Sequence, residues 1–188
     1  MKLSGSYQIN LEKQKVWEAL NDPEILKKTI PGCEKFKKNS DTEFSATATN
    51  KIGPFNASFT GNIELKDLNP PHSFKISGSG NSPVGFASGE AEVKLEDENG
   101  GTKLTYTVEA NVGGKIAQVG SRLIDMTAKK MADIFFGKFS ELVLNQSNVL
   151  KTETVSDVRV SRTKKSINTI LIYSSLIIII AIIIYSIS

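Results

Sequence analysis

Apolar and polar side chains alternate with a period of two along the middle of the chain, from about residue 43 to residue 112. The alternation is carried by runs at 44–48, 55–65, 74–80, 91–95 and 104–112. Such runs are typical of strands that bury one face, and Asn99-Gly100-Gly101 predicts a hairpin turn between the last two. With a further run at Lys2–Ile9 and a strand entered after Pro31-Gly32, the pattern predicts an antiparallel sheet of about seven strands.

A helical period replaces this alternation in three other segments. Leu11–Leu20 forms a short helical pattern that we expect Asn10 to cap. Asp22-Pro23-Glu24 supplies the cap, the proline and the acid that begin a second helix. From about Lys115 to Gln146 the spacing predicts one long helix. Its recurring positions are Ile116, Val119, Leu123, Thr127, Met131, Phe135, Phe139 and Leu142.

These elements predict an α+β protein in which a curved antiparallel sheet wraps around a long C-terminal helix, the helix-grip architecture. Small side chains at inner strand positions such as Ala46 and Ala110 leave space between sheet and helix, or alternatively let the sheet curl. We predict an apolar ligand cavity in that space. Its candidate lining residues are Phe44, Ala46, Ala48, Phe55, Ala57, Phe59, Phe74, Ile76, Phe86, Val93, Tyr106, Val108, Leu123, Met126, Thr127, Met131 and Phe135.

The C-terminal end of the chain differs from the rest. Residues 166–188 carry no charge, and 16 of these 23 are apolar. As a helix the segment is roughly 35 Å long, enough for a hydrocarbon core of about 30 Å. A buried core helix, the alternative, would show a polar face, and Leu176–Ile184 shows none. We predict a transmembrane tail anchor at 167–187, after a domain at 1–146 that binds a hydrophobic ligand and a polar, basic linker at 147–166.

Charge is distributed unevenly along the chain. Residues 1–150 hold 18 basic and 18 acidic side chains, so the net charge of +3 lies in the segment before the apolar end. A neutral domain argues against nucleic-acid binding. The basic residues flanking the apolar segment are Arg159, Arg162, Lys164 and Lys165. By the positive-inside rule they predict a single-pass C-terminal anchor in the cell membrane, with the domain on the cytoplasmic side.

Candidate catalytic chemistry is sparse. His72 is the one histidine and falls in a loop after Pro70-Pro71, and Cys33 is the one cysteine. Neither belongs to a nucleophile–base set or to a metal-ligand spacing, and Arg122 with Asp125 is read as a surface pair. We therefore expect no enzyme activity, no metal and no covalent cofactor. The glycine-rich stretch 78–89 is interpreted as a lid over the cup with Phe86 as a plug, or equally as a plain hairpin.

Three stretches resemble a known family. They are ALNDPEILKKTIPGCE at 19–34, the Lys51-Ile52-Gly53-Pro54 turn, and GTKLTYTVEANVGGKIAQVGSRLIDMTAKKMADIFFGKF at 101–139. They are similar to the CoxG family of carbon monoxide dehydrogenase subunits, within the START-like SRPBCC superfamily. The resemblance implies a helix-grip fold with a cavity for a hydrophobic molecule. It also implies association with a molybdenum-containing CO dehydrogenase or related oxidoreductase at the membrane, with quinone as the cargo.

The main hypothesis is a membrane-tethered carrier of an isoprenoid quinone, menaquinone or another. The tether would keep the cup close to its lipid store. A second hypothesis is an adaptor that recruits the dehydrogenase by surface contacts. A cyclase-like enzyme is the third, and the sparse chemistry disfavours it.

Overall fold

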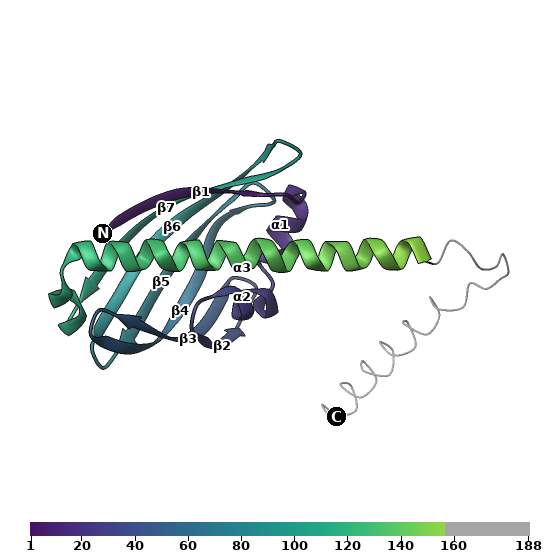
Figure 1. Ribbon diagram of the computed structural model, residues 1–188. Helices are drawn as coiled ribbons and strands as arrows, with labels where there is room; N and C mark the ends of the chain where they lie inside the picture. The colour runs from purple at the N-terminus through teal and green to yellow at the C-terminus, as the bar shows by residue number, and fades with distance from the viewer. Residues whose placement is uncertain (157–188) are drawn as a thin grey trace, which may run out of the picture. The chain divides into compact units, whose positions relative to one another are not determined.

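The computed structural model describes residues 1–156 of the 188-residue chain. Figure 1 shows one strand, two short helices, six further strands and one long helix in that order. The elements are β1 (Lys2–Ile9), α1 (Lys13–Leu20), α2 (Pro23–Thr29), β2 (Cys33–Lys38), β3 (Glu43–Ile52), β4 (Phe55–Asn69), β5 (Ser73–Ser82), β6 (Gly85–Glu98), β7 (Gly101–Gly113), the 3-10 helix η1 (Lys115–Val119) and α3 (Ser121–Ser156). The predicted α+β class and strand number are confirmed.

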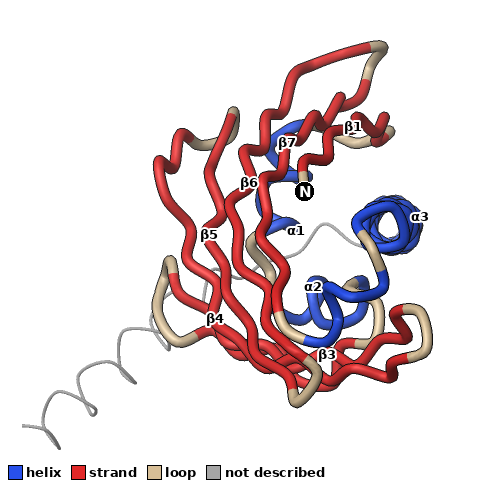
Figure 2. The backbone as a smooth tube through the Cα atoms, turned by 90° about the vertical axis from the view of Figure 1, so that its left-hand side faces the viewer, coloured by secondary structure: helices blue, strands red, loops and turns tan. Residues whose placement is uncertain are grey.

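The seven strands form one antiparallel sheet in the order β1-β7-β6-β5-β4-β3-β2. Seen along α3 in Figure 2, the sheet curves around a space that also holds α1 and α2. Along β4, β6 and β7, more buried and more exposed residues largely alternate, so one set of side chains faces this concave side. The arrangement is the helix-grip architecture.

The hairpin and the second helix follow the local signals in the sequence. Asn99 and Gly100 both have positive φ, 52° and 75°, as the tight turn between β6 and β7 requires. The Asp22 carboxylate accepts hydrogen bonds from the backbone N–H groups of Glu24 and Ile25, so it caps α2 as expected. The cap predicted for α1 is wrong: the N-cap residue is Glu12, and no side chain bonds there.

The long helical segment is interrupted near its start and is longer than predicted. Gly120, with φ of 89°, separates η1 from α3. The helix α3 then continues to Ser156, so residues 147–156 are helical, where we had expected the linker to begin. The other domain limits stay predictions. The predicted span at 167–187 and its basic flank lie outside the described residues, and within 1–156 no helix is long and apolar enough to cross a membrane.

The core lies between the sheet and the middle of α3. Phe136, Phe139 and Val143 are buried there against strand residues that include Ile9 and Leu104. Aromatic rings join the layers: the Phe136 ring stacks on Tyr7 at 4.2 Å and on Tyr106 at 5.6 Å between centroids. These large side chains fill the space between α3 and the sheet at this level of the helix.

Candidate ligand cavity

A small apolar hollow lies at the centre of the cup. Its volume is about 190 Å³, and its walls come from α1, α2, every strand except β1, and α3. The lining side chains are all hydrocarbon: Leu20, Leu26, Ile30, Phe36, Phe44, Ile63, Leu65, Phe74, Ile76, Val93, Leu104, Phe135 and Phe136. With no polar side chain on its wall, this hollow suits the apolar part of a ligand.

A second hollow, of about 380 Å³, adjoins the first. The two share Ile30 and Ile63, so the same side chains form part of both walls. The second is more open and is lined mostly by residues with small or no side chains: Ile30, Ala46, Ala48, Phe59, Gly61, Asn62, Ile63, Gly78, Ser79, Gly80, Ala87, Ser88, Gly89 and Ala110. The small inner positions of the strands therefore leave accessible space, as the alternation had suggested. Its volume falls in the range of about 300–1,000 Å³ for ligand pockets.

Eight of the predicted cavity residues line these hollows. Phe44, Phe74, Ile76, Val93 and Phe135 border the smaller one, and Ala46, Ala48 and Phe59 border the larger. Whether they contact a ligand stays a prediction.

Four predicted residues face inward without bordering either hollow. Ala57 is fully buried, while Phe55 and Val108 are half-buried on the same concave side. Tyr106 belongs to the core instead: its ring packs against both Tyr7 and Phe136, and a Cβ placed on Gly5 would lie 2.6 Å from its hydroxyl oxygen.

Phe86 is on the wrong side of the sheet for the predicted plug. On β6 the inner positions are Ala87, Gly89 and onward in steps of two, so Phe86 points to the convex face. There its ring lies over Gly113, its direct partner on β7, and it is 44 % exposed. The expectation that it faces the cup is wrong.

Four of the five predicted cavity residues on α3 border neither hollow, for a different reason. Met126 is 61 % exposed and faces solvent. Leu123 packs toward the β3–β4 turn, where a Cβ on Gly53 would lie 3.1 Å from it. Thr127 and Met131 are half-buried but border neither hollow. The Thr127 hydroxyl donates its hydrogen bond to the backbone carbonyl of Leu123.

Comparison with known proteins places this cup in a family. The model of the CoxG family of carbon monoxide dehydrogenase subunits matches residues 5–144, which include the sheet and most of α3. The chain belongs to the CoxG family. Its fold is the START-like, SRPBCC fold, so the resemblance seen in the sequence is confirmed.

Solved structures agree with the CoxG assignment. A conserved protein from Geobacillus kaustophilus is 30 % identical with a TM-score of 0.74, covering 77 % of this chain and 96 % of its own. TTHA0849 from Thermus thermophilus is 14 % identical (TM-score 0.61, 78 % and 99 % covered) and shares the fold. So does Ms6760 from Mycobacterium smegmatis, at 17 % identity (TM-score 0.59, 77 % and 92 % covered). No curated protein matches the chain.

Sequence reasoning missed the contribution of the second helix to the CoxG-family cup. Leu26 of α2 and Ile30, its C-cap residue, are four residues apart and face the smaller hollow, while Ile30 also borders the larger. Their helical spacing was a usable signal. The spacing does not show where α2 lies. Figure 2 shows it inside the curve of the sheet.

The polar groups of the cup offer little for catalysis. Burial raises the pKa of the Cys33 thiol, which makes the thiolate scarcer at neutral pH. His72 is exposed in its loop, and within residues 1–156 no cluster of His, Cys, Asp or Glu is arranged to hold a metal. Asp125 makes no ion pair with Arg122, and its buried Oδ1 has no hydrogen-bond partner in the described part of the chain.

The turn at the centre of 78–89 is attached to the segment that leads into α3. The N–H of Ile116 donates a 2.9 Å hydrogen bond to the carbonyl of Val84. Gly85 has φ of 148°, and a Cβ there would lie 2.1 Å from the Gly113 carbonyl oxygen. This close packing favours the plain-hairpin alternative over the lid.

A larger, polar hollow of about 670 Å³ lies among outward-facing side chains such as Glu43, Glu64 and Glu90. It is the largest hollow described. Its carboxylates and hydroxyls are unsuited to a hydrophobic molecule, so the candidate ligand site remains the pair of apolar hollows lined by the inner strand residues.

Proposed function

We propose that this CoxG-family chain is a membrane-tethered carrier that binds a hydrophobic molecule, an isoprenoid quinone such as menaquinone, between the sheet and α3. The pair of adjoining apolar hollows is the observation that carries the proposal. A ring system would lie in the larger hollow, where glycines and alanines leave width, and an isoprenoid unit in the smaller one. The chain's own residues do no chemistry on the cargo, and no covalent cofactor or metal takes part; the bound quinone would take up two electrons and two protons from the partner's reaction and leave as the quinol.

The partner and the location belong to the same proposal. The family is named for carbon monoxide dehydrogenase, so we propose a molybdenum-containing CO dehydrogenase or a related oxidoreductase as the enzyme that exchanges electrons with the bound quinone. The apolar segment 167–187 would anchor the chain in the cell membrane with the domain on the cytoplasmic side. A tether of this kind raises the local concentration of the cup at the bilayer.

Ala48→Phe tests the carrier. Ala48 borders the larger hollow, so a phenyl ring there occupies ligand space; Ser58 is exposed on the opposite face of the sheet, and Ser58→Phe is the matched control. We expect mass spectrometry of full chain purified from native membranes to find quinone with wild type and Ser58→Phe. Ala48→Phe should retain about tenfold less, equivalent to about 1.4 kcal/mol.

Electron transfer separates the carrier from the adaptor. If the chain is a carrier, Ala48→Phe should abolish CO-dependent reduction of the membrane quinone pool. If the chain is an adaptor, the variant should keep this activity, since recruitment by surface contact does not need the cavity. Wild-type chain that never contains a hydrophobic molecule, or an Ala48→Phe variant with full electron transfer, contradicts the proposal.

A further inference from the structure

The wall formed by α2 and β2 is basic on its outer side. The segment 23–38 contains five lysines and two glutamates, whereas residues 1–150 together are neutral. Lys38 pairs with Asp41. The other four, Lys27, Lys28, Lys35 and Lys37, are exposed and form no ion pair within residues 1–156. We refer to these four residues as the lysine wall.

The inner side of the same wall borders the ligand space. Leu26 and Ile30 face the smaller hollow from α2 and its C-cap, on either side of the Lys27–Lys28 pair in the sequence. In β2, Lys35 and Lys37 directly flank Phe36, which also lines that hollow. One layer of backbone therefore carries apolar side chains toward the cargo and ammonium groups toward solvent.

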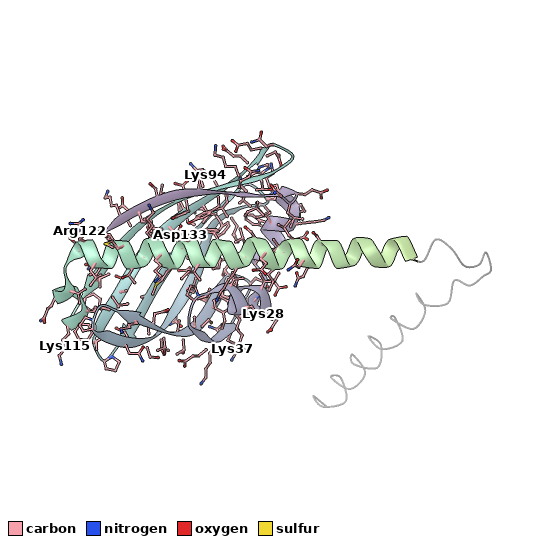
Figure 3. All side chains as sticks on the ribbon, viewed as in Figure 1. Lys28, Lys37, Lys94, Lys115, Arg122 and Asp133 are labelled. Atoms are coloured by element: carbon pink, nitrogen blue, oxygen red, sulfur yellow. The ribbon has the colours of Figure 1, made fainter. Side chains whose placement is uncertain are left out.

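The lysine wall lies at an open border of the cup. β2 is the last strand of the sheet and pairs only with β3, so its other edge is free of strands. In Figure 3 the labelled Lys28 and Lys37 lie near each other below α3, while Lys115 and Arg122 lie at the opposite end of the domain. The lysine wall thus places four exposed ammonium groups beside one boundary of the smaller hollow, separate from the exposed cations at Lys115 and Arg122.

We propose that the lysine wall docks onto the anionic surface of a lipid bilayer, and that the hydrophobic cargo passes between bilayer and smaller hollow across the α2–β2 edge. The second half of this statement rests on the proposed carrier function; the docking does not. Each lysine near an anionic surface contributes about fivefold in affinity. A lysine keeps its ammonium at the headgroups while its methylenes reach inward, which suits a wall with an apolar inner side.

The test uses the full chain in vesicles, with a fluorophore on Asn39→Cys just after β2 in a Cys33→Ser background. Headgroup-labelled lipid quenches the fluorophore, and the quenching is normalised to the amount of protein bound to vesicles. Two kinds of vesicle are compared: phosphatidylcholine alone, and phosphatidylcholine with about one-third phosphatidylglycerol. We expect stronger quenching on the anionic vesicles, lost at high salt. Lys35→Glu/Lys37→Glu should reduce it to the level of neutral vesicles. Lys51→Glu/Lys115→Glu, the same charge change at exposed sites elsewhere, should not.

Equal quenching on neutral and anionic vesicles overturns the docking, and so does an equal loss in the two charge-reversed variants. A third outcome is that quenching is the same on neutral and anionic vesicles while Lys35→Glu/Lys37→Glu lowers CO-dependent electron transfer. The lysine wall then binds an acidic protein surface, and the bilayer proposal is wrong.

Quinone content, measured in parallel, tells the two proposals apart. Lys35→Glu/Lys37→Glu should bind quinone added in detergent as wild type does, since the substituted side chains are exposed and do not line the hollow, whereas its quinone content from native membranes should fall. Wild type that docks but contains no hydrophobic molecule overturns the carrier and leaves the docking standing. Wild type that contains quinone but shows no charge-dependent quenching overturns the docking and leaves the carrier standing.

Discussion

At the scale of single residues, Tyr7 fastens the first strand to the last helix. Its hydroxyl donates a hydrogen bond to the Asp133 carboxylate of α3, and its ring stacks on Phe136. Burial, and then the bond to Asp133, raise the pKa of Tyr7 above its ordinary value of about 10. The folded state therefore favours the protonated phenol, which is the form that donates the bond.

We predict from this pKa that the fold loses stability in alkaline solution. Because the folded pKa exceeds the unfolded one, the stabilisation from Tyr7 is complete below the unfolded pKa of about 10 and is lost as pH rises toward the folded value. Tyr7→Phe should lower the free energy of unfolding by about 1–2 kcal/mol at about pH 8. It should also make the decline above about pH 10 shallower than in wild type.

Urea unfolding at several pH values measures both effects. Tyr106 also has a raised pKa, from burial, so Tyr7→Phe should leave part of the alkaline decline in place. A wild-type stability that stays level through about pH 11, or a decline as steep in Tyr7→Phe, contradicts the assignment.

At the scale of elements, α3 shows how a helical pattern misleads over a long distance. Steps of four residues advance by about 40° beyond a full turn, so a series spaced by four drifts around the helix. Phe139 is on the buried side, and four such steps place Leu123, sixteen residues earlier, about 160° away around the helix, which is why Leu123 and Thr127 do not border the hollows. The side facing the sheet includes Asp125, Phe136 and Val143, which are eleven and eighteen residues apart.

We predict that this facing side, and not the opposite one, determines stability. Phe139 is completely buried, and Phe139→Ala should cost about 3–5 kcal/mol through lost contacts and a new cavity. Met126→Ala removes an exposed side chain and should change the free energy of unfolding by less than about 0.5 kcal/mol. Thermal or urea unfolding of both variants measures these changes in the free energy of unfolding. Equal losses in the two variants would show that the helix is rotated from the orientation described.

Local signals were sufficient for most elements and insufficient for the cavity. The Asp22 side chain and the Asn99-Gly100 backbone act on their immediate neighbours in the sequence, so the α2 cap and the hairpin were predictable. Phe86 lies beside a turn, and the prediction that it faces inward rests on its aromatic side chain alone. The alternation of β6 assigns it to the outward face. The hollows depend on how far Phe136 and its neighbours hold α3 from the sheet, and no local pattern records that spacing.

At the scale of the whole molecule, two separate attractions to the membrane are proposed: an apolar span at 167–187 and charges that act only at an anionic surface. They differ in strength and in response to salt. Insertion of a span is effectively irreversible, whereas the lysine wall and the basic residues 159–165 bind reversibly and are screened within about 8–10 Å at ordinary ionic strength.

Removing residues 167–188 separates the two. We expect the full chain to stay in membranes through salt and carbonate washing, and the shortened chain to appear mainly in the soluble fraction. A residual share of the shortened chain should bind anionic vesicles at low salt and be released as salt rises, because its lysines remain. Replacing 167–187 by an unrelated apolar span of equal length is the control and should restore wash-resistant binding. A shortened chain that survives carbonate washing would show that the described domain itself inserts, and would remove the need for an anchor.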